Sequence, residues 1–271
     1  MTIRIMQSGG TIGAEILDVD LARDPPIAKI RQALLDHLVV FFRGQTLTSA
    51  DFRGFAARIG SPIDYPFAPG IEGFPEITPV VKLPDQTINF GGNWHSDTTY
   101  LPEPPMATLL LARDLPAFGG DTMFANQYIA YETLSDGMKS ILRGLRGVSR
   151  SDKAEASRTR EDREKRTGEK SAVLTAAHPA VRTHPETGRE ALYVNLAHTA
   201  HFEGMTEEES LPILRYLWRH QTRPEFTCRF AWSTGALAMW DNRCVQHHAI
   251  NDYHGQKRVM HRITLAGDVP R

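Results

Sequence analysis

The sequence Phe-Thr-Cys-Arg-Phe-Ala-Trp at residues 226–232 alternates, with a period of two, between larger apolar side chains and smaller or polar ones. This alternation is typical of a strand with one buried face, because successive side chains of a strand point to opposite faces. Two neighbouring segments predict further strands, namely the short buried run at residues 236–240 and the last strand at residues 259–265. The last third of the chain is therefore predicted to be mainly β.

Apolar runs earlier in the chain predict more strands of the same kind. Residues 39–42, 106–112 and 122–124 form such runs, and residues 191–195 are strand-like as well. Residues 61–93 are rich in proline and glycine and predict a loop with short strands. Loops of this kind often line binding sites.

Helical patterns flank these strands. Residues 27–38 carry apolar side chains at approximate helical spacing. Thr48 with Asp51, and Thr206 with Glu209, have the spacing of a capping box in front of two further apolar stripes. Many short strands with flanking helices predict a mainly β fold of the α+β kind, a double-stranded β-helix, which is a cupin-like jelly roll.

Length and composition bound the kind of protein. The 271 residues, with a mass of 30.3 kDa, fit one domain spanning residues 1–271. The 31 basic and 32 acidic side chains nearly cancel and form no basic stripe, which argues against nucleic acid and favours a small-molecule partner. Residues 150–171 are dense in both charges and poor in large apolar side chains, which predicts either a solvated excursion or a mobile lid over the site.

The expected compartment is the cytoplasm. The N-terminal residues lack the apolar run and cleavage site of a signal peptide, and no later segment approaches the length of a membrane span. The only two cysteines, Cys228 and Cys244, would remain thiols in a reducing compartment. We therefore expect no membrane partner.

Two histidines and one carboxylate form a candidate metal site. His95 and Asp97 are two residues apart, so in an extended segment both side chains point to the same face and can hold one ion. His247, from a distant strand, would complete the set. Such a set is typical of non-haem iron(II) oxygenases and leaves three positions of an octahedral ion open. A bidentate 2-oxoacid and O2 together require those positions.

Two arginines on the last predicted strand indicate the co-substrate. Arg258 follows His247 by eleven residues, and its planar guanidinium matches the far carboxylate of 2-oxoglutarate. Thr122, which follows a glycine-rich turn, could add a hydroxyl donor to the same carboxylate. Arg262 lies four residues after Arg258, on the same face of the strand, and could reach the C1 carboxylate or an anionic group of the substrate.

Taken together and in order, these motifs resemble the taurine dioxygenase family of iron(II) and 2-oxoglutarate-dependent oxygenases. The resemblance covers about residues 5–268 and rests on Asn-Trp-His-Ser-Asp-Thr-Thr-Tyr at residues 93–100, Gly-Gly-Asp-Thr at 119–122, and the stretches 181–189 and 240–262. It implies a double-stranded β-helix, a likeness to enzymes that are commonly homo-oligomers, and hydroxylation of a small acid such as a sulfonate, sulfate ester or aryloxyalkanoate, with release of succinate and CO2.

The same resemblance implies roles for single residues. His95, Asp97 and His247 correspond to the iron ligands, Thr122 and Arg258 to the residues that hold the distal carboxylate, and Arg262 to a residue beside the anionic head of the substrate or co-substrate.

One departure from the family pattern concerns the substrate. Where taurine-specific members carry a histidine, this chain has Ile-Asp-Tyr-Pro-Phe at residues 63–67, and Gly91 with Gly92 stands where they hold the taurine amine with asparagine. We therefore expect a substrate other than taurine. The aromatic side chains predicted to wall a more apolar pocket are Tyr65, Phe67, Phe90 and Tyr100.

Two other functions use the same residues. A zinc hydrolase would combine the three ligands with a metal-bound water, although Arg258 and Thr122 have no evident role in it. A non-catalytic jelly-roll protein would bind 2-oxoglutarate or a metal without turnover. Succinate production that depends on iron(II), O2 and 2-oxoglutarate separates the three hypotheses.

Overall fold

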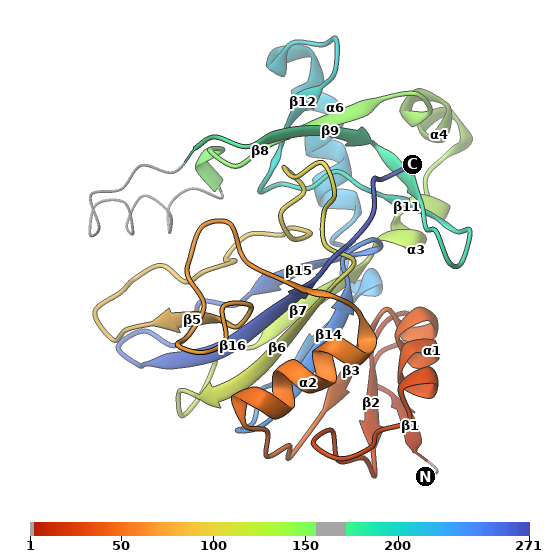
Figure 1. Cartoon of the computed structure of the whole chain (residues 1–271). Coiled ribbons are helices and arrows are strands. Elements are labelled where there is room, and N and C mark those ends of the chain that lie inside the picture. The colour runs from red at the N-terminus through yellow and green to blue at the C-terminus, as the bar shows by residue number, and fades with distance from the viewer. Residues whose placement is uncertain (1–2, 156–171) are drawn as a thin grey trace.

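Two antiparallel sheets that pack face to face form the centre of the molecule. The computed structural model describes residues 3–155 and 172–271 (Figure 1). The larger sheet has the strand order β1 (Arg4–Gln7), β2 (Ala14–Leu17), β3 (Val39–Phe42), β14 (Leu237–Asp241), β6 (Ala107–Asp114), β16 (Arg258–Leu265) and β4 (Pro62–Ile63), and β5 (Thr78–Lys82) also pairs with β16. The smaller sheet has the order β13 (Thr227–Phe230), β7 (Thr122–Asn126) and β15 (Val245–Ala249).

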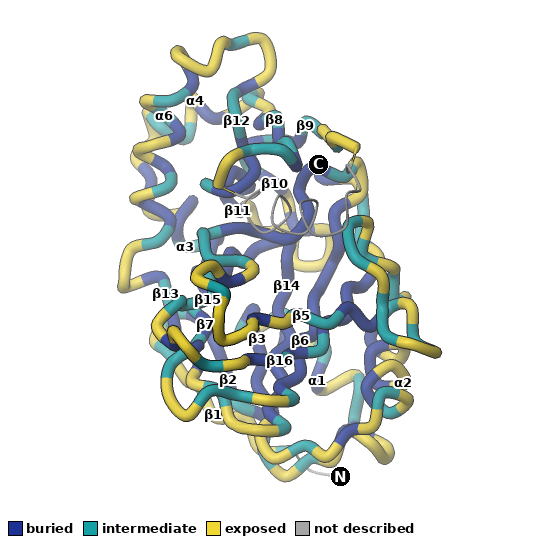
Figure 2. Tube along the Cα trace, turned by 90° about the vertical axis from the view of Figure 1, so that its left-hand side faces the viewer, coloured by how far each residue is buried: buried dark blue, intermediate teal, exposed yellow. Residues whose placement is uncertain are grey.

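The period of two along each strand separates two hydrophobic cores. In β3, Val40 and Phe42 point into a core on the outer face of the large sheet, whereas Val39 and Phe41 point into the core between the two sheets. Strand β6 divides its leucines in the same way. Burial on both faces explains why these strands are continuous apolar runs, and Figure 2 shows β14 and β6 as buried through the middle of the molecule.

Helices α1 (Ile27–His37) and α2 (Ser49–Ile59) cover the outer face of the large sheet (Figure 1). Helix α2 begins with the predicted capping box, because Thr48 accepts a hydrogen bond from the backbone of Asp51 and Asp51 returns one to Thr48. Gly60 ends this helix in an extended conformation, and a Cβ there would meet Met106 and Leu265 at 3.2 and 3.3 Å.

A third layer lies above one end of the two sheets (Figure 1). It contains a sheet of order β12 (Thr199–Phe202), β8 (Arg146–Arg150) and β9 (Thr175–Pro179), and the hairpin of β10 (Val181–Thr183) and β11 (Glu190–Leu192). Its helical elements are α3 (Gln127–Glu132), α4 (Asp136–Leu142), α6 (Glu207–His220) and the 3-10 turn η1 (Pro224–Phe226). A separate core of side chains from α3, β11 and α6 holds this layer together.

The predicted jelly roll is confirmed, with corrections at strand ends. The strand predicted at residues 191–195 ends at Leu192, and the one predicted at 226–232 begins at Thr227 because Phe226 belongs to the turn η1. Of the predicted lid, residues 156–171 lie outside the described residues. No helix in the described part of the chain is both long and apolar enough to cross a membrane.

Candidate active site

His95, Asp97 and His247 meet where the segment before β6 crosses β15. His95 and His247 pair as an isolated antiparallel bridge, with backbone N–H to O distances of 3.1 and 2.8 Å. One ligand atom from each of the three side chains lies within 4.8 Å of the others, and all three side chains are buried. The structure therefore brings together the three residues predicted as metal ligands.

The protonation states suit a divalent cation. Burial above all lowers the pKa of His95 and of His247, so both imidazoles are neutral near pH 7. Burial alone works to raise the pKa of Asp97, but the Arg262 guanidinium and the two imidazoles outweigh it and hold this pKa well below its usual range. Nδ1 of His95 lies 2.7 Å from the carbonyl oxygen of Asn93, which favours the proton on Nδ1 and leaves the Nε2 lone pair for a metal.

A small inner cavity of about 30 Å³ connects this cluster with two residues predicted to bind the co-substrate, Thr122 on β7 and Arg258 on β16. Arg258 is buried, yet its Nε and Nη2 atoms have no hydrogen-bond partner among the described residues. Gly120, with φ of +74°, leaves space for this side chain, because a Cβ there would lie 3.3 Å from Nε of Arg258. A buried guanidinium with unpaired nitrogens is a binding site for an anion.

Arg262 lies between the metal cluster and the outer cavity. Its Nη2 atom is 2.9 Å from Oδ1 of Asp97, but the contact lacks hydrogen-bond geometry. Its guanidinium lies over the ring of Tyr65, 5.1 Å from the centroid. Arg262 lines both the inner and the outer cavity, so the structure is compatible with either of its predicted contacts.

The outer cavity has a volume of about 430 Å³ and an aromatic wall. The rings of Tyr65 and Phe67 are 5.9 Å apart, those of Tyr65 and Phe90 are 6.1 Å apart, and those of Phe67 and Tyr100 are 5.6 Å apart. All four residues predicted to contact the substrate therefore line one surface. Val81, which is 43% exposed, extends this apolar surface to the mouth of the cavity.

Three residues near the cluster had no predicted role of their own or only a weak one. His198 lines the outer cavity, and its ring centroid is 5.8 Å from that of His95. Thr108 donates a hydrogen bond of 2.6 Å to Oδ2 of Asp97, and Asn242 donates one of 2.9 Å to Thr108. The sequence signal for Thr108 is a single hydroxyl in an apolar strand.

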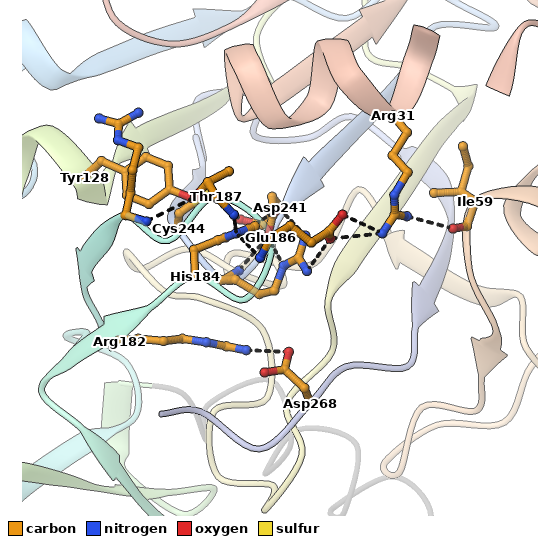
Figure 3. A network of polar contacts seen from close by, with 12 residues as sticks. Arg31, Ile59, Tyr128, Arg182, His184, Glu186, Thr187, Asp241, Cys244 and Asp268 are labelled. Carbon is orange, nitrogen blue, oxygen red and sulfur yellow. Dashed lines mark hydrogen bonds and ion pairs between the residues drawn. The ribbon is translucent and has the colours of Figure 1, made fainter. Parts of the chain in front are cut away.

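A second buried cluster, formed by His184, Asp241 and Cys244, has ligand atoms equally close together. Its donor and acceptor positions are already used, because His184 accepts backbone hydrogen bonds at Nδ1 and its Nε2 lies 3.0 Å from Oδ2 of Asp241. Arg243 adds contacts of 2.7 and 2.8 Å to the same carboxylate. The cluster thus belongs to an ion-pair network that continues through Glu186 to Arg31 on α1 (Figure 3).

The comparisons with known proteins agree with this geometry. The model of the family "Taurine catabolism dioxygenase TauD, TfdA family" matches residues 4–264. An alpha-ketoglutarate-dependent sulfate ester dioxygenase of Pseudomonas putida is 35% identical over 272 residues, which cover 96% of this chain and 88% of that protein. Alpha-ketoglutarate is another name for 2-oxoglutarate.

Two solved structures share the whole fold. A taurine dioxygenase from Burkholderia xenovorans has a TM-score of 0.84 and 38% identity, covering 100% of this chain and 93% of that one. AAD-2 in complex with Mn(II) and N-oxalylglycine has a TM-score of 0.82 and 29% identity, covering 100% and 99%. The chain therefore belongs to the TauD/TfdA family and is a 2-oxoglutarate-dependent dioxygenase.

Proposed function

We propose that this dioxygenase binds iron(II) through His95, Asp97 and His247 and hydroxylates an anionic organic substrate with an apolar body. The observation that supports the co-substrate site most directly is the buried Arg258, whose Nε and Nη2 atoms have no partner among the described residues. The two neutral imidazoles and one carboxylate fit the ligand set of non-haem iron oxygenases. When bound, the iron supplies the activation of O2 that couples decarboxylation of 2-oxoglutarate to hydroxylation of the substrate.

Arg258 and Thr122 hold the distal carboxylate of 2-oxoglutarate in this proposal. The hydroxyl of Thr122 accepts a hydrogen bond from Nε1 of Trp232, so its own proton is left for a carboxylate oxygen. Arg258 offers two further donors and a full charge in surroundings that exclude water. Together these groups fix one end of the co-substrate and direct its 2-oxoacid end toward the metal ligands.

Arg262 binds an anion beside the metal. In the structure its guanidinium shares Oδ1 of Asp97 with the two imidazoles, and a metal ion on that oxygen would leave the guanidinium for an anionic group. Of the described residues that line the outer cavity, Arg262 is the only arginine or lysine. This composition favours a substrate with one anionic head, and the aromatic wall favours an apolar body. Sulfate esters, sulfonates and aryloxyalkanoates all have this form.

The test is a succinate assay with the wild-type protein and His95→Ala across alkyl sulfates, sulfonates and aryloxyalkanoates. We expect succinate only with iron(II), O2 and 2-oxoglutarate together, stimulation by substrates with an apolar body, and none from the variant. Product release without O2 or with zinc alone would contradict the oxygenase mechanism. Binding of 2-oxoglutarate without succinate would indicate a non-catalytic protein.

The proposal includes a homo-oligomer of one dioxygenase domain, residues 1–271, in the cytoplasm, without nucleic acid or membrane as a partner. The two cysteines are both buried and free, as a reducing compartment would keep them. Light scattering after gel filtration is expected to give a multiple of the chain mass of 30.3 kDa. A particle of the single-chain mass would contradict the oligomer.

A further inference from the structure

The two oxygens of the Asp97 carboxylate have different surroundings. Oδ1 faces Nε2 of His95 at 3.7 Å and Nε2 of His247 at 3.9 Å. Oδ2 points away from the imidazoles and accepts a hydrogen bond of 2.6 Å from Oγ1 of Thr108. Asp97 and Thr108 are both buried, so water does not readily replace this hydrogen bond.

Thr108 is itself held in place by Asn242. The Nδ2 atom of Asn242 donates to Oγ1 of Thr108 at 2.9 Å, and its Oδ1 atom accepts from Nε1 of Trp240 at 2.9 Å. The direction of each bond follows from chemistry, because an indole N–H only donates and an ionised carboxylate only accepts. Thr108 must therefore donate its one proton to Asp97, and Asn242 must present its NH2 group to Thr108.

This hydrogen-bond chain is built on paired strands. Trp240 on β14 lies opposite Thr108 on β6 in the register of the large sheet. The ring of Trp240 also packs against His247, with centroids 4.5 Å apart, and the backbone nitrogen of Asp97 lies 3.5 Å from Oδ1 of Asn242. The chain thus contacts two of the three residues in the cluster, from elements that are rigid.

We propose that Thr108 and Asn242 are positioning residues that hold Asp97 as a one-oxygen metal ligand. This inference rests on the metal site of the proposed function. A carboxylate that bound through both oxygens would occupy two positions of an octahedral ion, and only two would remain after the histidines. By engaging Oδ2, Thr108 keeps three positions open, as a bidentate 2-oxoacid and O2 require.

The experiment measures metal affinity and uses a matched control. Thr108→Val removes the hydroxyl at nearly constant volume, and Thr108→Ser restores it. The control is Thr264→Val, because Thr264 is a buried threonine directly opposite Thr108 on β16 and its hydroxyl lies near the carbonyl oxygen of Ile63 instead. Each apoprotein is titrated with Co(II) alone, and the visible absorption of the bound ion reports the number and arrangement of its ligands.

Thr108→Val is expected to bind Co(II) about 10- to 100-fold more weakly than the wild type, as loss of a residue that orients a metal ligand typically does. Its cobalt spectrum should change, whereas the spectra and affinities of Thr108→Ser and Thr264→Val should stay close to the wild type. A Thr108→Val protein with wild-type affinity and spectrum would overturn the inference. An equal loss in Thr264→Val would overturn it too, because the effect would then be general destabilisation.

Asn242→Ala provides a second test if Thr108→Val fails to fold. It leaves the Thr108 hydroxyl in place but removes the group that directs it, so we expect weaker Co(II) binding in this variant as well. Unchanged binding in Asn242→Ala would contradict the proposed chain. A wild-type protein that binds no divalent metal would overturn the metal site itself, which separates failure of the proposed function from failure of this inference.

Discussion

The Nε1 atom of Trp232 donates a hydrogen bond of 3.0 Å to Oγ1 of Thr122. Trp232 also lies beside Arg258, whose guanidinium carbon is 5.8 Å from the indole ring centroid. One tryptophan therefore contacts both groups that we propose for the distal carboxylate of 2-oxoglutarate. It fixes the direction of the Thr122 hydroxyl and covers one side of the arginine.

The Trp232–Thr122 contact predicts that these two residues act as a unit. Trp232→Phe keeps most of the ring but lets the Thr122 hydroxyl turn, so the KM for 2-oxoglutarate should rise. Thr122→Val should raise it as well, and the double variant should raise it by less than the product of the two single effects. Steady-state succinate assays give the four values, and independent effects would contradict the coupling.

Arg258→Ala should raise the KM for 2-oxoglutarate by about 10- to 100-fold, because a charge-assisted hydrogen bond contributes roughly 1.5–3 kcal/mol. The KM for the substrate should change little. Arg229→Ala is the matched control, since Arg229 is an exposed arginine that pairs with Asp121 on the outside of the same region. If both variants behave alike, Arg258 has no specific role in binding the co-substrate.

Phe67→Ala should weaken binding of substrates with an apolar body while leaving the KM for 2-oxoglutarate unchanged. Phe67 lines the outer cavity and contacts Tyr65 and Tyr100 there. The loss of aromatic contact should grow with the apolar surface of the substrate, so KM should rise more for a long alkyl sulfate than for a short one. An equal effect on both chain lengths would argue against an apolar binding wall.

The buried ion-pair network of Figure 3 predicts a dependence of stability on acid. Burial works to raise the pKa of Asp241, but hydrogen bonds from Arg243 and His184 hold it well below its usual range. A carboxyl whose pKa is lowered by folding stabilises the protein above its unfolded pKa of about 4 and loses this contribution as pH falls. The free energy of unfolding should therefore decrease as the pH drops below about 5.

Arg243→Met should reduce the free energy of unfolding near pH 7 by about 3–5 kcal/mol, because it leaves the buried Asp241 without its partner. It should also flatten the loss of stability in acid. Arg23→Ala is the control, since its ion pair with Asp20 is exposed and such pairs contribute less than about 1 kcal/mol. Urea denaturation of the three proteins across this pH range measures both effects.

Much of the fold could be predicted because the central strands are buried on both faces. Strands β3, β6 and β14 are continuous apolar runs in the sequence, and the capping boxes mark the starts of α2 and α6. Strand β1 was not predicted, since all four of its residues are exposed and no alternation marks them. Arg-Gly-Val-Ser-Arg in β8 likewise forms a strand only through its pairing with β9 and β12.

The candidate site divides in the same way. His95, Asp97, His247 and Arg258 could be identified from residue chemistry and order, and the structure brings them around adjoining cavities. The role of Thr108 depends on the register of β6 against β14, which no local pattern gives. The partner of His184 was also not foreseen, because Asp241 lies 57 residues away in the chain.

The two cavities draw their walls from different kinds of structure. The inner one relies on strands β7, β14, β15 and β16, whereas much of the outer one comes from the loops between residues 63 and 100. Engineering of substrate range can therefore be confined to the loops, with the strands left unchanged. Libraries at Tyr65, Phe67 and Phe90 should yield many active variants with altered preference, because chemistry and recognition are encoded in separable parts of the chain.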